Sequence, residues 1–174
     1  TGFSSYTSNV GNLLNQGIEF ELSSLNIGLR NFTWSTDFNF TWQRSTVESL
    51  PNGGSDIIYG DGGMYIHREG EYMYSFYLPV WKGVNPENGL GEFWVDPEDH
   101  SKGVTNYYTE AGSTIVGKAL PDFVGGLTNT MTFMDDMFDI SFLISYQFGG
   151  SLFDYPGYFT HSDGFRAASM NAAD

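Results

Sequence analysis

Residues 32–43 of the chain read FTWSTDFNFTWQ, in which nearly every second residue is large and apolar. The apolar positions are Phe32, Trp34, Phe38, Phe40 and Trp42, with Thr36 as the one gap. A period of two over twelve residues predicts a β-strand with two unlike faces. Soluble strands usually have about five or six residues, whereas a strand that crosses a bilayer needs roughly nine to eleven. The length therefore brings a transmembrane strand into consideration.

The spacing of the aromatic residues agrees with the thickness of a membrane. Trp42 follows Trp34 by eight residues and Phe32 by ten. At about 3.4 Å per residue and a tilt near 40°, these separations become roughly 21 to 26 Å along the membrane normal. A long edge strand of a soluble sandwich, with its aromatic side chains facing the core, has the same alternation. This strand alone leaves both interpretations open.

Composition narrows the class of protein. The chain has 174 residues, 17% of them aromatic, with 22 glycines and no cysteine, which is typical of a β-rich fold with many turns. The net charge of −14 argues against nucleic acid as a partner and against a peripheral protein held on anionic lipid. The sequence contains no run of eighteen apolar residues, so it predicts no transmembrane helix.

Three further segments alternate in the same way, over residues 16–25, 123–133 and 138–148. With the first strand they predict two antiparallel hairpins, at 16–45 and 122–148. The connections are expected at residues 26–31, around Gly28, and at 134–137. The predicted fold class is all-β, with antiparallel strands that form part of a transmembrane barrel and with long extracellular loops.

The hairpins also predict an orientation. In outer-membrane barrels the short turns are periplasmic and the long loops are extracellular. Residues 46–121 therefore form either a mainly extracellular excursion or an even number of further crossings, and residues 149–174 start another extracellular loop. The chain lacks an initiator Met, a signal peptide and a terminal Phe-tipped strand, so we expect it to be an excerpt of a longer protein.

The barrel interpretation assigns the two faces of the strands. The residues predicted to face lipid are Phe32, Trp34, Phe38, Phe40, Trp42, Phe138, Ile140, Phe142, Ile144 and Tyr146. The residues predicted to face the lumen are Glu19, Glu21, Asp37, Asn39, Thr128, Thr130 and Asp139. A soluble sandwich predicts instead that Trp34, Phe38, Phe40 and Trp42 are buried against a second sheet of the same chain.

Candidate catalytic and metal sites are few. Glu19 and Glu21 lie about 7 Å apart on one strand face, a carboxylate pair that could serve glycoside hydrolysis. The acidic residues of segment 96–99 could bind calcium, but they lack the spacing of an EF-hand loop. His67, His100 and His161 are isolated, and no catalytic fingerprint occurs. The sequence therefore predicts no enzyme, no cofactor and no metal site.

Aromatic residues of the middle and tail could stack on sugars, because an aromatic ring offers a large apolar face. They are Tyr59, Tyr65, Tyr72, Trp81, Trp94, Tyr107, Tyr108, Tyr155 and Tyr158. Packing of the loops against themselves is the alternative role, so we expect two or three of these rings at most to touch a ligand.

Three blocks of sequence resemble a known family. They are NQGIEFEL at residues 15–22 with the strand at 32–43, then EGE at 69–71 through WKGVNPENG at 81–89, and GKALPDFVGG at 117–126. Together they resemble the C-terminal barrel region of the SusC/RagA-type TonB-linked outer-membrane proteins of the Bacteroidetes. The resemblance spans nearly the whole chain.

The resemblance implies a 22-stranded barrel in the Gram-negative outer membrane, closed by a plug domain that is absent from this chain. Members import nutrients, mostly glycans and in some cases peptides, together with a SusD-like surface lipoprotein. TonB-ExbB-ExbD energises transport through regions outside this chain. The expected function is therefore part of a TonB-dependent importer of oligosaccharides. The alternative is a soluble β-sandwich that binds or cleaves carbohydrate.

Overall fold

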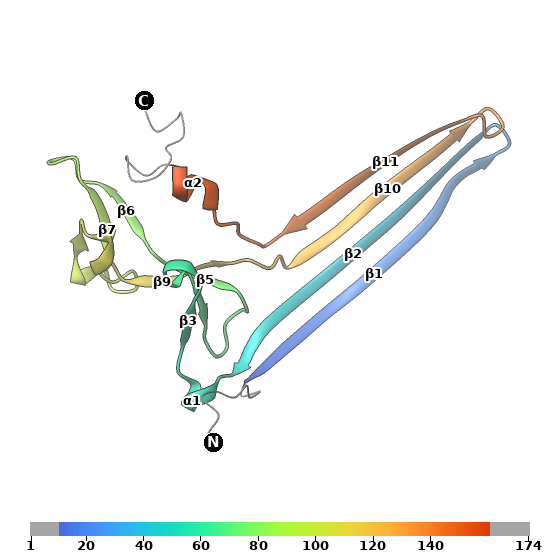
Figure 1. The fold of residues 1–174 in the computed structure, drawn as a ribbon. Coiled ribbons are helices and arrows are strands. Elements are labelled where there is room, and N and C mark those ends of the chain that lie inside the picture. Colours follow the sequence, from blue (N-terminus) through green and yellow to red (C-terminus); the bar gives the residue numbers. More distant parts are fainter. Residues whose placement is uncertain (1–10, 161–174) are drawn as a thin grey trace, which may run out of the picture.

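The long strands of the chain form one antiparallel sheet (Figure 1). The computed structural model describes residues 11–160. The sheet contains β1 (Asn12–Leu29), β2 (Phe32–Ser49), β10 (Phe123–Phe133) and β11 (Phe138–Phe148), in the order β1-β2-β10-β11. We call it the long sheet. The two predicted hairpins thus lie side by side, and β2 pairs with β10 across some seventy intervening residues.

The tight turns of both hairpins lie at the same end of the long sheet (Figure 1). The Met134 N–H donates to the Asn31 carbonyl at 3.0 Å, which links the two turns. The turn at residues 134–137 is confirmed. The first turn consists of Arg30 and Asn31 alone, because β1 continues through the predicted turn to Leu29. The first hairpin covers residues 12–49 and is longer than the predicted 16–45.

A β-bulge explains why simple alternation ends at residue 25. Leu25 pairs with Ser35 and Ile27 pairs with Trp34, so Asn26 is an extra residue in β1. An extra residue reverses which face the following side chains occupy. Ile27 and Leu29 therefore lie on the same face as Trp34 and Phe32, where an unbroken strand would have turned them to the other face.

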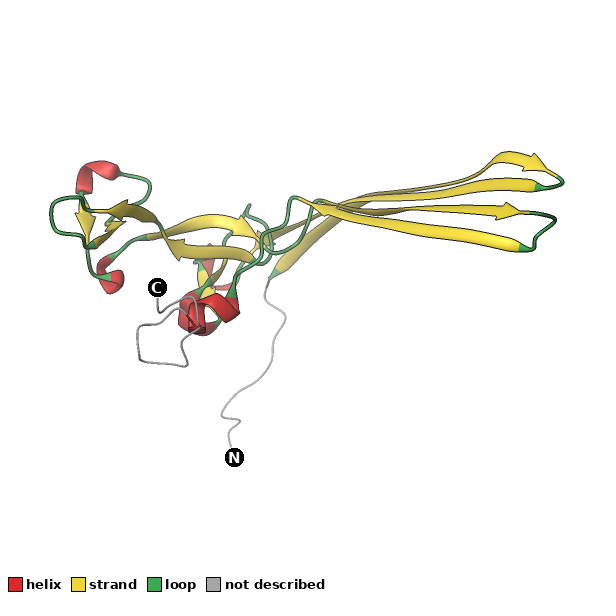
Figure 2. Cartoon of the chain, turned by 90° about the horizontal axis from the view of Figure 1, so that it is seen from above, coloured by secondary structure: helices red, strands yellow, loops and turns green. Residues whose placement is uncertain are grey.

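The segment between β2 and β10 folds into two small sheets beyond the loop end of the long sheet (Figures 1 and 2). Sheet B contains β3 (Ile57–Tyr59), β4 (Tyr65–His67), β5 (Ser75–Pro79) and β9 (Ser113–Lys118). Sheet C contains β6 (Trp81–Val84), β7 (Gly91–Trp94) and β8 (Val104–Thr105). Short helical segments complete it: α1 (Pro51–Gly54), η1 (Asp61–Gly63), η2 (His100–Lys102) and η3 (Tyr108–Glu110), with α2 (Tyr155–Thr160) after β11.

The strands of sheets B and C have two to six residues, fewer than the roughly nine needed for a crossing. For residues 46–121, strands of this length favour an excursion over further crossings, and the excursion stays a prediction. No helix within residues 11–160 is long and apolar enough to cross a membrane.

Sheet B is fixed to the end of β2 by backbone pairing and a small core. The Val47 N–H donates to the Glu71 carbonyl at 3.0 Å, and the Gly70 N–H donates to the Val47 carbonyl at 2.8 Å. The buried apolar side chains of the described residues are Val47, Met64, Ile66 and Phe76. This core lies at the junction, so the excursion has a defined position relative to the long sheet.

The long sheet itself has no layer packed on it within residues 11–160 (Figure 2). Trp34, Phe38, Phe40 and Trp42 are only partly covered, by their neighbours in the sheet. On the outer strands, Ile18 is 62% exposed and Ile144 is 53% exposed. The soluble sandwich, which requires those aromatic residues to be buried against a second sheet, is therefore wrong.

Candidate functional site

Strand pairing places all ten residues predicted to face lipid on one side of the long sheet. Directly paired residues point to the same side of an antiparallel sheet. Phe38, for example, pairs with Leu22 and Leu127, and Leu127 pairs with Ile144. We call this side the apolar face, with members Ile18, Phe20, Leu22, Ile27, Leu29, Phe32, Trp34, Phe38, Phe40, Trp42, Phe123, Leu127, Met131, Phe133, Phe138, Ile140, Phe142, Ile144, Tyr146 and Phe148. Their contact with lipid stays a prediction.

All seven residues predicted to face the lumen share the opposite side, the polar face. Its carboxylates are Glu19, Glu21, Asp37 and Asp139, and its neutral polar residues include Asn39, Thr128 and Thr130. Within β1, β2, β10 and β11 this face carries no Lys or Arg. The Ser23 hydroxyl donates to Asp37 at 2.6 Å. Glu19 and Glu21 are both exposed on the sheet, which offers no enclosed site there for the acid/base chemistry considered for them.

A polar cluster interrupts the apolar face near its middle, and the sequence pattern did not reveal it beyond the gap at Thr36. Asn129 accepts from the Trp34 indole N–H at 2.9 Å and from the Thr36 hydroxyl at 2.8 Å. Asn26, the bulge residue, donates to the Thr36 hydroxyl at 2.6 Å and accepts from Ser24 at 3.0 Å. The cluster satisfies these groups within the sheet, so they need no water.

Gly125 is required by a close approach on the apolar face. The Tyr146 ring lies across it, and the Tyr146 hydroxyl donates to the Asn39 carbonyl at 3.1 Å. A side chain at residue 125 would collide with both the ring and that backbone oxygen. The glycine therefore lets an aromatic ring cover the sheet at this point.

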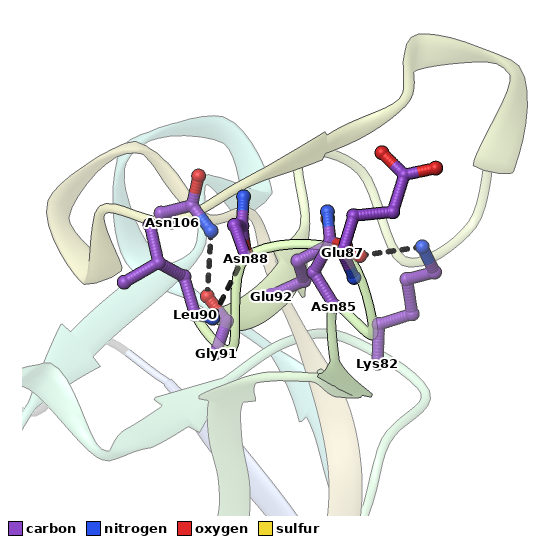
Figure 3. A network of polar contacts seen from close by, with 8 residues as sticks. All are labelled: Lys82, Asn85, Glu87, Asn88, Leu90, Gly91, Glu92 and Asn106. Carbon is purple, nitrogen blue, oxygen red and sulfur yellow. Dashed lines mark hydrogen bonds and ion pairs between the residues drawn. The ribbon is translucent and has the colours of Figure 1, made fainter.

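The hairpin formed by β6 and β7 is organised around the buried carboxylate of Glu92 (Figure 3). Lys82 Nζ donates to it at 2.6 Å and Asn85 Nδ2 at 2.9 Å. These donors hold the pKa of Glu92 below its usual range, and Lys82 has the larger effect. The turn between the strands is closed by Asn85 and Asn88, whose side chains accept from the Glu87 and Leu90 N–H groups.

The carboxylates of Asp96 and Asp99, in the segment considered for calcium, accept hydrogen bonds from residues of the same turn. Asp96 accepts from Lys102 Nζ at 2.6 Å and from the Glu98 N–H at 2.9 Å. Both contacts lower the pKa of Asp96, and the contact with Lys102 has the larger effect. Asp99 accepts from the Ser101 hydroxyl and N–H, which lowers its pKa also. No group of three potential metal ligands occurs within residues 11–160.

Most aromatic rings of the excursion pack against each other. Tyr59 lies against His67, with ring centroids 4.3 Å apart, and Trp94 stacks on His100 at 3.8 Å. Burial raises the pKa of Tyr59 and lowers that of His67. Tyr107, Tyr108 and Trp81 are the most exposed of these rings, at 68%, 58% and 52%. The side chain of Tyr158 and all of His161 lie outside the described part of the chain.

Comparison with known proteins places these features in a family. No protein-family model matches the chain. It is 31% identical over 175 residues to TonB-dependent receptor P3 of Formosa agariphila, covering 89% of this chain and 17% of that protein. It is 30% identical over 149 residues to TonB-dependent receptor SusC of Bacteroides thetaiotaomicron, covering 78% of this chain and 14% of that protein.

The fold agrees with a solved transporter. The RagAB peptide transporter structure matches with a TM-score of 0.79 at 21% identity, over 91% of this chain and 18% of that one. The chain thus spans less than a fifth of the proteins that it matches. These relatives are outer-membrane receptors and transporters of Gram-negative Bacteroidetes, not enzymes. The chain therefore belongs to the SusC/RagA-type TonB-dependent receptors of the outer membrane, of which it forms a β-barrel segment.

Proposed function

We propose that the chain is part of an outer-membrane importer of nutrients, in which the long sheet contributes four strands of the barrel. The observation that carries this proposal is the division of the long sheet into an apolar and a polar face over about eleven residues of each strand. In a barrel the apolar face meets lipid and the polar face lines the lumen or meets the plug. Sheets B and C then stand on the extracellular side.

The solute that we propose is a neutral oligosaccharide. The four carboxylates of the polar face have no cation beside them on these strands, so the lumen wall repels polyanions. Trp81 and Tyr107 offer open rings on the outer excursion, which suit stacking on a sugar. The likeness to a structure described as a peptide transporter favours a second candidate, a neutral or cationic peptide.

The whole receptor is proposed to work with a SusD-like surface lipoprotein and to take its energy from TonB-ExbB-ExbD. The plug and the TonB contact belong to regions outside this chain. Among the described residues, the segment between β2 and β10 extends beyond the loop end of the long sheet, where we expect a surface partner to bind.

Uptake by cells that carry the full-length receptor tests the proposal. Labelled neutral oligosaccharides, and in parallel neutral and cationic peptides, are supplied to wild-type cells, to a deletion strain and to the complemented strain. We expect uptake that requires both the receptor and the proton gradient. Uptake that survives deletion, or that persists when the gradient is collapsed, would contradict the proposal. If the cells take up peptides and no oligosaccharide, a peptide replaces the oligosaccharide as the proposed solute.

A further inference from the structure

Two cations contact one tyrosine ring where the long sheet meets the outer sheets. The Arg44 guanidinium carbon lies 5.0 Å from the centroid of the Tyr72 ring, and Lys118 Nζ lies 3.5 Å from it. The three residues come from β2, from the segment before β5 and from β9, so only the tertiary fold brings them together. A cavity of about 350 Å³ lies beside them, lined also by Gln16 and Asp122.

The position of this cluster follows from the strand register. Arg44 comes two residues after Trp42 in β2, so its side chain continues the row of the apolar face. Tyr72 forms a β-bridge with Thr46, the next residue of the same row. The Arg44–Tyr72–Lys118 cluster therefore lies at the loop end of the apolar face, just beyond its last aromatic residue.

The cluster carries positive charge that the protein does not neutralise. Lys118 pairs with Asp122, but Arg44 is exposed and has no ion pair with any described residue. Its partner across β1 is the neutral Gln16. By contrast, Arg68, Lys82 and Lys102 each pair with a carboxylate of their own. An unpaired arginine is notable in a chain that has seven basic and twenty-one acidic residues.

We propose that Arg44, Tyr72 and Lys118 bind the phosphate group of a lipid in the outer leaflet. This inference rests on the proposed function, because it takes the apolar face to meet lipid. The cluster then lies at the level of the headgroups, outside the lumen. A guanidinium and an ammonium group are the side chains that bind phosphate most strongly. Since water occupies about 30 Å³ per molecule, the cavity has room for a phosphate and several waters.

Lipid retention by the purified full-length receptor tests the site. The receptor is placed in phosphatidylcholine nanodiscs that contain a small fraction of lipid A, either with both phosphates or dephosphorylated, and bound lipid is counted by native mass spectrometry. The variant is Arg44→Gln with Lys118→Gln. The matched control is Lys82→Gln with Lys102→Gln, which removes the same charge from β6 and η2. We expect about a tenfold loss of phosphorylated lipid in the first variant and none in the control.

Three results would overturn the site while leaving the barrel intact. They are equal retention by the Arg44/Lys118 variant and the wild type, equal retention of dephosphorylated lipid A, and displacement of the lipid by inorganic phosphate at millimolar concentration. The heat-modified gel mobility of each variant reports separately whether the barrel has formed, and Arg44→Gln alone serves if the double variant fails to form one. Failure of the wild type to form a barrel would count against the proposed function instead.

Discussion

At the scale of the residue, Asn129 is the clearest example of a polar group that the apolar face must satisfy internally. Its side-chain oxygen accepts hydrogen bonds from both Trp34 and Thr36. The whole residue is only 7% exposed. In lipid neither donor could turn to water. This residue could not be identified from the sequence, because Asn129 fits the alternation of β10 without indicating its partners ninety-odd residues earlier in β2.

Replacement of Asn129 by Leu should destabilise the receptor. The change leaves the Trp34 N–H and the Thr36 hydroxyl without their acceptor, a cost of about 1–3 kcal/mol in the free energy of unfolding. Chemical denaturation of the full-length receptor in detergent measures it. The control is Thr128→Ala, on the opposite face, where we expect a change within about 0.5 kcal/mol. A neutral or stabilising effect of Asn129→Leu would contradict the role given to the cluster.

At the scale of the element, sequence alternation predicted the bounds of β10 and β11 closely and the start of β2. The other features of the fold could not be predicted from the sequence, for physical reasons. The bulge at Asn26 breaks the period of β1. The strands of sheets B and C are too short for a period to be recognised. The meeting of Arg44, Tyr72 and Lys118 depends on tertiary structure alone.

The pairing of β2 with β10 predicts which cysteine pairs can form a disulfide. Ser35 lies directly opposite Thr130, so Ser35→Cys with Thr130→Cys should crosslink on mild oxidation of a cysteine-free full-length receptor. The control, Ser35→Cys with Thr132→Cys, is displaced by two residues and should crosslink poorly. Gel mobility before and after reduction provides the measurement. Equal crosslinking of both pairs, or preference for the second, would contradict this register.

The hairpin of β6 and β7 should loosen in acid. The pKa of Glu92 and that of Asp96 lie below their ordinary values of 4.5 and 3.8, mainly through Lys82 and Lys102. A lowered carboxyl pKa stabilises the fold above its unfolded value, and that contribution is lost as pH falls through the folded value. A spin label at Glu87→Cys should therefore gain mobility below about pH 4.

Two comparisons make the acid experiment specific. In a Glu92→Gln background the label at residue 87 should already be more mobile at pH 7, since the ion pair with Lys82 is absent. A label at Ser145→Cys on the polar face should change little. Identical spectra of the residue-87 label at pH 7 and pH 3 would show that these carboxylates do not hold the hairpin.

At the scale of the whole molecule, the long sheet is incomplete without neighbouring strands. Within residues 11–160, the outer edges of β1 and β11 have no paired strand. Unpaired backbone groups are not tolerated in the hydrocarbon layer, so the barrel must supply a strand on each side. Residues 1–174 expressed alone should therefore aggregate in water and disperse only in detergent. Size-exclusion chromatography of a water-soluble monomer would contradict this expectation.

If the long sheet is part of the barrel wall, its apolar face meets lipid and its polar face does not. Nitroxide labels are attached to a cysteine-free full-length receptor in bilayers, at the adjacent positions Phe38 and Asn39 and at Ile140 and Asp139. Collision with oxygen reports lipid, and collision with a water-soluble nickel chelate reports water. We expect high oxygen and low nickel accessibility at residues 38 and 140, and low oxygen accessibility at 39 and 139. Equal values at adjacent positions, or exclusion of both reagents at 38 and 140, would contradict it.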